Sequence, residues 1–176
     1  ANGCRFRTIR SIYTMSHQVR IKGKVSLCQS PHLPAVVRLW EANKRHPLGE
    51  TKISDDNEHN GLFIIDAPSF SHEAVYYLTA QLPEQDVLLL SVLSPAIYRT
   101  IGEHIVTLNE LTTVASAFTC AQFFEGLSLT GNLHSITIAA KNTPNLVDPL
   151  TGSWGDVLTD PFNVTQNETL ARINTL

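Results

Sequence analysis

Histidine and acidic side chains are the groups in this sequence whose chemistry most often serves catalysis or metal binding. The seven histidines are scattered, and no two lie three or four residues apart, the spacing that gathers metal ligands on one helix face. His72-Glu73 and Glu103-His104 are adjacent pairs that could join a general acid-base arrangement after folding. The alternative interpretation of each histidine is a surface or loop residue.

The sequence lacks the motifs that identify common enzyme classes. It has no Gly-x-Ser-x-Gly elbow, no His-Glu-x-x-His pair, no phosphate-binding glycine loop and no dinucleotide fingerprint. We therefore expect a protein with no catalytic residues and no cofactor. A hydrolase site that involves His72 or His104 is kept as the alternative.

An acidic segment between two predicted strands offers oxygen ligands. Asp56, Glu58 and Asn60 alternate and are followed by Gly61, as at the start of a calcium-binding loop. Position twelve of that loop would be Ala67, which has no bidentate carboxylate. Asn60-Gly61 also suits a hairpin in which both residues need positive φ. The segment is interpreted as a hairpin connection, with a calcium site as the alternative.

Aromatic side chains are the best candidates for ligand binding, because their faces bring a large contact area at low entropic cost. Trp40, Tyr76 and Trp154 are predicted to offer stacking surfaces to sugar rings or to a partner protein. Core packing is the competing interpretation for Trp40 and Tyr77, since each lies within a strand pattern.

The cysteines are Cys4, Cys28 and Cys120, an odd number with no close pair, so neither a zinc site nor a disulfide framework is indicated. A disulfide between Cys4 and Cys28 is kept as one alternative, and a lipid attached to Cys4 as another. Asn163 and Asn167 begin N-glycosylation acceptor triplets, which matter only in a secreted eukaryotic chain.

Composition indicates an ordinary globular chain. Its 176 residues are 43% hydrophobic, enough for a sizeable core in one domain or two small ones. The charged share is 16% and the net charge is -3, which argues against nucleic acid as a partner and against disorder. Residues 1–18, with Arg5, Arg7 and Arg10, are interpreted as a basic N-terminal arm. The longest predicted helix is too short to span a membrane.

Short apolar runs separated by turn residues predict an antiparallel sandwich. The alternation of Val19, Ile21, Gly23 and Val25 with basic residues is typical of a half-buried strand. The run at residues 86–93 is continuously apolar and is expected to be a central strand, with a short buried helix as the alternative. The predicted strands cover residues 19–27, 35–41, 50–54, 62–65, 74–80 and 86–93.

Helical patterns follow. Thr107 and Glu110 have the capping-box spacing, so a buried helix is predicted from Thr107 to Phe124. Its uncharged second face carries Thr112, Ser116 and Thr119, which could contact another helix closely. The apolar face is predicted to hold Leu108, Leu111, Val114, Ala115, Phe118 and Ala121.

The last third of the chain mixes helices and a loop. A second helix is predicted over residues 133–141, and residues 145–156 are expected to form an irregular loop that Leu146 and Trp154 pin to the core. A last helix is predicted over 168–176, and its lack of a stop signal indicates that the natural chain continues.

Several of these residues together resemble a known family. Gly23-x-Val25, Pro34 with Val36, Val37 and Leu39, Asn60-Gly61-x-Phe63 and Tyr77-Leu78-x-Ala80 are similar to the carboxypeptidase regulatory-like, or transthyretin-like, β-sandwich. The second half is similar to a helical segment that follows such sandwiches in large exported bacterial proteins of unknown function. The resemblance implies an α+β chain with a transthyretin/Ig-like sandwich over 19–105 and a helical segment over 106–176.

The resemblance also implies a function. Such modules are usually non-catalytic, so we expect a secreted or cell-surface module for attachment, assembly or binding of protein or glycan, with self-association as one form of assembly. The expected location is extracellular, periplasmic or the cell surface. The alternative is an accessory N-terminal module of a larger exported hydrolase or lyase.

Overall fold

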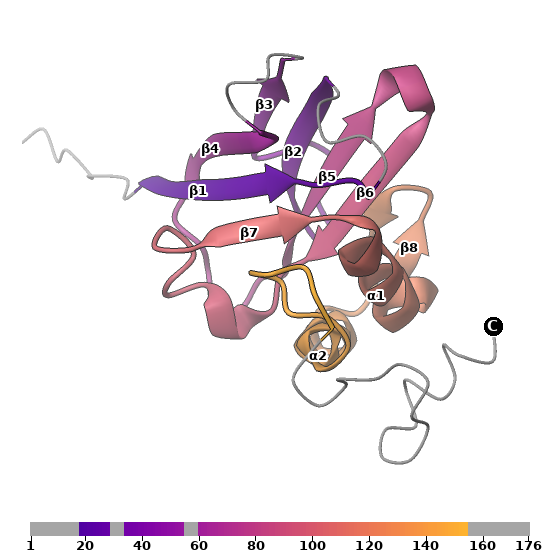
Figure 1. Ribbon diagram of the computed structural model, residues 1–176. Coiled ribbons are helices and arrows are strands. Elements are labelled where there is room, and N and C mark those ends of the chain that lie inside the picture. Colours follow the sequence, from indigo (N-terminus) through magenta and orange to yellow (C-terminus); the bar gives the residue numbers. More distant parts are fainter. Residues whose placement is uncertain (1–17, 29–33, 55–59, 155–176) are drawn as a thin grey trace, which may run out of the picture.

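The computed structural model describes residues 18–28, 34–54 and 60–154 (Figure 1). Its strands are β1 (Gln18–Val25), β2 (Ala35–Glu41), β3 (Gly49–Ile53), β4 (Leu62–Pro68), β5 (Tyr76–Leu82), β6 (Val87–Val92), β7 (Ile105–Leu108), β8 (Phe124–Glu125) and β9 (Ser128–Leu129). Its α-helices are α1 (Glu110–Cys120) and α2 (Leu133–Asn142), and its short 3-10 helices are η1 (Pro83–Gln85), η2 (Pro95–Ile97), η3 (Ala121–Phe123) and η4 (Thr143–Asn145).

The long strands form two sheets. Within the described residues, the first sheet has the order β4-β1-β7 and the second has the order β3-β2-β5-β6. The second sheet is antiparallel throughout, and β1 is antiparallel to β4. The predicted antiparallel arrangement is wrong for one pair, because β7 runs parallel to β1. Mainly antiparallel sheets with two short α-helices make the described part an α+β structure, as predicted.

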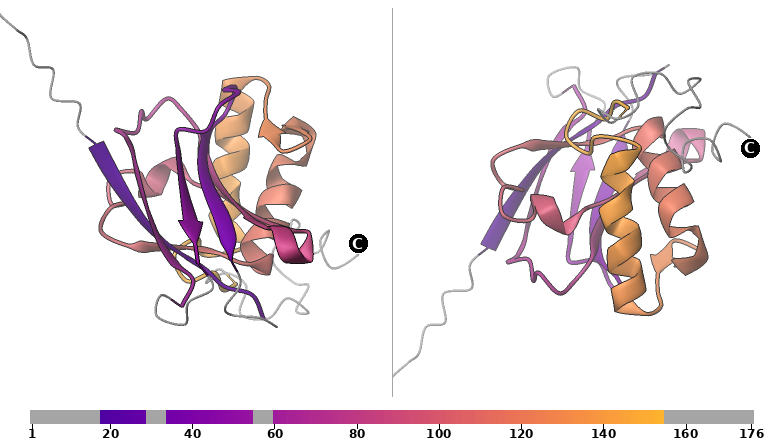
Figure 2. Two further views of the ribbon diagram at one scale, coloured as in Figure 1. Left: turned by 90° about the horizontal axis from the view of Figure 1, so that it is seen from above. Right: turned by 90° about the horizontal axis from the view of Figure 1, so that it is seen from below.

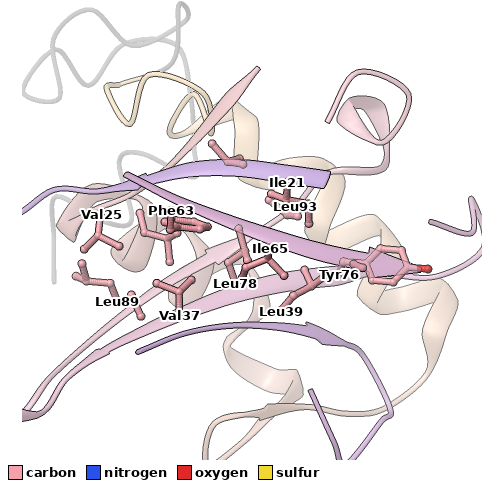
Figure 3. Packing of buried hydrophobic residues seen from close by; sticks show 14 of the residues in the cluster. Ile21, Val25, Val37, Leu39, Phe63, Ile65, Tyr76, Leu78, Leu89 and Leu93 are labelled. Atoms are coloured by element: carbon pink, nitrogen blue, oxygen red, sulfur yellow. The ribbon is translucent and has the colours of Figure 1, made fainter. Parts of the chain in front are cut away.

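The two sheets share one apolar core. The predicted alternation in β1 is confirmed, since Ile21 and Val25 are buried whereas Lys22 and Lys24 are exposed. Figure 3 shows inward side chains from both sheets pointing toward one another, and their burial is the main stabilising contribution to the fold. The labelled members of this cluster are Ile21, Val25, Val37, Leu39, Phe63, Ile65, Tyr76, Leu78, Leu89 and Leu93.

Gly23 allows an especially close contact inside this core. It lies opposite Phe63 in the pairing of β1 with β4, and a Cβ atom at Gly23 would overlap the aromatic ring. A glycine inside a strand usually marks such a close approach. The ring of Phe63 therefore covers the space that a larger residue in β1 would take.

The helices cover the outer face of the second sheet. Both α1 and α2 lie on the same side of the strands, and they run beside each other (Figure 2). Tyr77 and Val92 from the sheet pack there with Cys120 of α1 and Ile136 of α2. The chain thus has an apolar layer on each face of the β3-β2-β5-β6 sheet.

Helix α1 begins later than the sequence pattern predicts. Thr107 is not its cap; it lies in β7, because Val106 and Leu108 are buried in the core when this segment pairs with β1. Asn109 is the cap instead: its side chain accepts from the Thr112 amide at 2.9 Å, and Thr112 Oγ1 accepts from the Asn109 amide at 3.0 Å. These two residues, three positions apart, form a capping box with Thr112 in the place of the usual acid.

The buried face of α1 also differs from the predicted one. Val114 is 48% exposed although it was assigned to the apolar face, while Thr112 and Ser116 are 2% and 0% exposed. The helix therefore turns its hydroxyl face inward. The reason lies in β6, which was expected to be a central strand but is the last strand of its sheet.

Hydroxyl groups of α1 bond the free edge of β6. Thr112 Oγ1 donates to the carbonyl of Leu90 at 3.0 Å, and Thr113 Oγ1 accepts from the Leu90 amide at 3.0 Å. Ser116 Oγ accepts from the Val92 amide at 2.9 Å. An uncovered edge strand exposes unpaired backbone groups, and here the helix supplies their partners. The predicted helix contact is also present, because Thr119 bonds Thr143 at the end of α2 at 2.8 Å.

Two turns are as predicted. Asn60 and Gly61 have φ angles of 48° and 77°, so both adopt the positive φ expected of the hairpin. The loop after η4 is held by Leu146, which is fully buried, and by a bridge between Val147 and Trp154. This loop covers the outer edge of β7, where the Thr107 amide donates to the carbonyl of Pro149 at 2.9 Å.

Some predictions fall outside the described residues. They are the basic arm up to residue 17, Cys4, most of the acidic loop at 55–59, the glycosylation triplets at Asn163 and Asn167, and the helix over 168–176. The predicted division at 105/106 falls within β7, which belongs to the β1 sheet.

Candidate functional site

The three aromatic candidates lie in three different clusters. Trp40 is half-buried and stacks on Tyr77, with ring centroids 6.3 Å apart, and its Nε1 donates to Thr79 Oγ1 at 2.9 Å. Tyr76 belongs to the core between the sheets, where it is 4% exposed and stacks on Phe70 at 4.0 Å. Trp154 packs on the small cluster around Leu146. The structure therefore does not bring these residues together into one binding surface.

The acid-base and metal candidates are equally dispersed. Asp56 and Glu58 lie outside the described residues, and Asn60 forms the hairpin. In the described ranges, no group of three or more histidine, cysteine or acidic residues could hold a metal ion. His72 and His104 are both exposed, and they lie in separate loops, before β5 and before β7. Cys28 is exposed, and its bridge to Cys4 stays a prediction.

Cys120 is not suited to nucleophilic chemistry. It is fully buried between α1 and the second sheet, and burial raises the pKa of its thiol. The thiolate is the reactive form of cysteine, so a raised pKa keeps this side chain inert.

A groove beside α1 is lined by apolar and uncharged side chains. Its volume is about 350 Å³. The second sheet forms the floor, α1 forms one wall, and the turn between β8 and β9 closes one end. The lining residues are Thr79, Leu88 and Leu90 on the floor, Thr113, Ala117 and Ala121 on the wall, and Phe124, Gly126 and Leu127 at the end.

The local sequence explains this shape. Strands β5 and β6 alternate, so Thr79 and Leu90, which pair across the two strands, point to the same outer face. Thr113 and Ala117 of α1 and Ala121, the residue that caps its C-terminal end, recur every four residues and form a stripe of small side chains. Small residues on this stripe leave space between the helix and the sheet.

The groove is apolar, and most of its polar groups are already bonded. No charged residue lines it. Thr113 Oγ1 donates to the carbonyl of Asn109 at 2.7 Å and accepts from Leu90, and Thr79 Oγ1 accepts from Trp40. Of the two threonine hydroxyl groups in the lining, the Thr79 hydroxyl has no acceptor for its hydrogen among the described residues. The groove therefore offers apolar contact and little hydrogen bonding.

The rim of the groove is more polar. Arg38 pairs with Thr79 across β2 and β5, and its Nε lies 2.7 Å from Glu50 Oε2 of β3. At the opposite end, Leu127 is 57% exposed in the β8–β9 turn. An apolar centre with a polar rim is the usual anatomy of a protein interface.

Sequence reasoning did not find this groove. Ala117, Ala121 and Leu127 were not among the predicted site residues, because a stripe of small residues on a helix is common in cores. The four-residue spacing of Thr113, Ala117 and Ala121 was the available signal, but it identifies a groove only when the sheet position is known.

Comparisons with protein-family models, curated proteins and solved structures find no match to this chain. Among the described helices, none has the length and apolar character needed to cross a membrane. The function must therefore be argued from the geometry of the groove.

Proposed function

We propose that the chain is a non-catalytic binding module of a secreted or cell-surface protein, and that it holds a partner protein by one apolar side chain inserted in the α1 groove. The uncharged groove, whose two threonine hydroxyl groups already accept hydrogen bonds, is the observation that carries this proposal. An aliphatic or aromatic side chain can fill such a site without leaving a buried polar group unpaired.

The same observation favours protein over glycan as the ligand. Sugar rings carry many hydroxyl groups and need hydrogen-bonding partners around an aromatic face. One face of Trp40 stacks on Tyr77 and its ring nitrogen is bonded to Thr79, so this residue has no free hydrogen-bond donor for a sugar. A protein partner can place an apolar anchor against Leu90 on the groove floor and polar groups near the Arg38–Glu50 pair.

Within this proposal the fold is a transthyretin-like sandwich. Support comes from the positions of the family-like residues: Gly23 and Phe63 meet in the core, Asn60-Gly61 forms the hairpin, and Leu78 is fully buried. These are structural positions, so they bear on the fold and leave the ligand to be argued from the groove. In the accessory-module alternative, the same groove would hold the catalytic part of a larger exported hydrolase or lyase.

A peptide-display selection on the purified protein tests the proposal. We expect the selected peptides to share an apolar anchor residue and to bind at least ten times more weakly to Ala117→Glu and Leu127→Asp variants. Val114→Glu is the matched control, because Val114 is exposed on α1 and does not line the groove. Its binding should equal that of the wild type.

Two results would overturn the proposal. One is a set of selected peptides without an apolar anchor, and the other is equal affinity for the wild type and both groove variants. Analytical ultracentrifugation of the protein alone then asks whether a second copy occupies the groove, since self-association that Ala117→Glu abolishes would identify this chain as its own partner.

A further inference from the structure

A second hollow lies where the turn after β6 meets α2, away from the α1 groove. Its volume is about 530 Å³, and it shares no lining residue with the groove. The short helix η2 lies beside α2 in this region (Figures 1 and 2). The lining residues are His72, Ser94, Pro95, Ala96, Arg99 and Lys141.

The charged lining of this hollow is entirely basic. Arg99 follows η2, Lys141 lies in the last turn of α2, and His72 lies between β4 and β5, so three separate elements converge. No acidic residue lines the hollow, and the ion pairs found in the described ranges involve neither Arg99 nor Lys141. Lys141 also lies at the negative end of the α2 dipole, which accounts for its position on the helix but not for its neighbours.

Ser94 caps η2 and adds a neutral hydroxyl group to the lining of the hollow. It is 3% exposed, and its Oγ accepts a hydrogen bond from the Ala96 amide at 3.4 Å. Within the described part, the Ser94 hydroxyl hydrogen has no acceptor. A buried hydroxyl normally uses its donor, because leaving it unpaired is unfavourable. Either water or a ligand oxygen that enters the open hollow can accept this hydrogen.

We propose that this hollow binds the phosphate group of a small phosphomonoester. Arg99 and Lys141 carry two permanent positive charges, which match the charge of close to -2 on a phosphomonoester at neutral pH. Ser94 donates its hydroxyl hydrogen to a phosphate oxygen, and Pro95 and Ala96 contact the organic part of the ligand. A cavity of about 530 Å³ is larger than a phosphate alone requires, so the ester group has room.

Calorimetric titration with a hexose 6-phosphate, inorganic phosphate and the unphosphorylated hexose tests this site. We expect saturable binding of the hexose phosphate, weaker binding of inorganic phosphate and no binding of the hexose. Arg99→Gln should weaken hexose phosphate binding at least tenfold, and Lys141→Gln about fivefold. Lys44→Gln is the control, because it removes the same charge from an exposed turn outside the hollow and should change nothing.

Ser94→Ala distinguishes a site with a specific hydrogen bond to phosphate from nonspecific electrostatic attraction to a basic surface. It leaves the charge unchanged, so a loss of at least threefold in affinity, with the circular dichroism spectrum preserved, supports a phosphate held by this hydroxyl. Equal affinity of the wild type and Arg99→Gln would overturn the proposal, as would equal binding of a hexuronic acid, which has a carboxylate in place of the phosphate. Absence of hexose phosphate binding by the wild type would overturn it as well.

Discussion

Ser116 Oγ accepts a hydrogen bond of 2.9 Å from the backbone nitrogen of Val92, so a helix side chain takes the place of a neighbouring strand. Thr112 and Thr113 do the same for both backbone groups of Leu90. The β6 edge is thereby closed to other chains, which is how proteins commonly avoid pairing between exposed edges. The hydroxyl face of α1 therefore has a structural role, because it completes the hydrogen bonding of the sheet at its β6 edge.

Ser116→Ala should reduce the free energy of unfolding by about 1–3 kcal/mol, because it leaves the buried Val92 amide without a partner. Urea denaturation followed by circular dichroism measures this change. The slope of the free energy of unfolding against urea concentration should be unchanged, since the surface exposed on unfolding does not change.

Thr137→Ala is the control for this substitution. The Thr137 hydroxyl donates only to the carbonyl of Leu133 in its own helix, at 2.8 Å, so its removal should change stability by about 0.5 kcal/mol or less. Equal stability of the Ser116→Ala variant and the wild type would contradict the assigned role of this hydroxyl.

Much of the fold could be predicted because strands that bury one face show an alternation of apolar and polar residues in the sequence. The alternation in β1 and the Asn60-Gly61 hairpin were predictable because strand period and positive φ are local properties. The face of α1 was not predictable, because the need for Ser116 to face inward arises only once β6 lies at the sheet edge.

Neither binding site could be predicted, since each depends on contacts between distant elements. The groove needs Leu90 of β6 beside Ala117 of α1, and the basic hollow needs Arg99 and Lys141 brought together from separate elements. Thr107 shows the same limit on a smaller scale: its spacing to Glu110 imitates a cap, but pairing with β1 makes it part of a strand.

Gly23→Ala should reduce stability by about 1–3 kcal/mol, because the new methyl group overlaps the buried ring of Phe63. Phe63→Leu alone should also be destabilising, through the loss of core contacts. The double variant should be more stable than the sum of the two changes predicts, by about 0.5–3 kcal/mol, since the shorter side chain relieves the overlap. Strict additivity in urea denaturation would contradict this close contact.

Asn109→Ala should destabilise the protein more than Asn132→Ala does. Both residues cap helices, and loss of a cap alone costs about 1 kcal/mol. Asn109 Nδ2 also donates to the carbonyl of Gly152 at 2.7 Å and so ties α1 to the following loop. Hydrogen exchange should show faster exchange around residues 147–154 only in the Asn109 variant. Equal losses of stability in the two variants would show that Asn109 acts only as a helix cap.

Alkaline pH should destabilise the protein through its buried tyrosines. Burial raises the pKa of Tyr98, and it also raises the pKa of Tyr77. The unfolded chain releases these protons at about pH 10, the ordinary value for tyrosine, whereas the folded protein retains them to higher pH. Full stability is therefore present below about pH 10, and the free energy of unfolding falls as the pH rises toward the folded pKa, by at most about 1.4 kcal/mol per pH unit for each tyrosine.

Tyr98→Phe tests this linkage. The Tyr98 hydroxyl accepts from the Tyr76 amide and donates to the carbonyl of Ala74, both at 3.1 Å, so its loss should cost about 1–3 kcal/mol at neutral pH. Above about pH 10 the variant should lose stability less steeply than the wild type, because it has one fewer proton to release on unfolding. Thermal unfolding at a series of pH values measures both effects. Parallel pH profiles for the two proteins would show that Tyr98 does not contribute to the alkaline loss of stability.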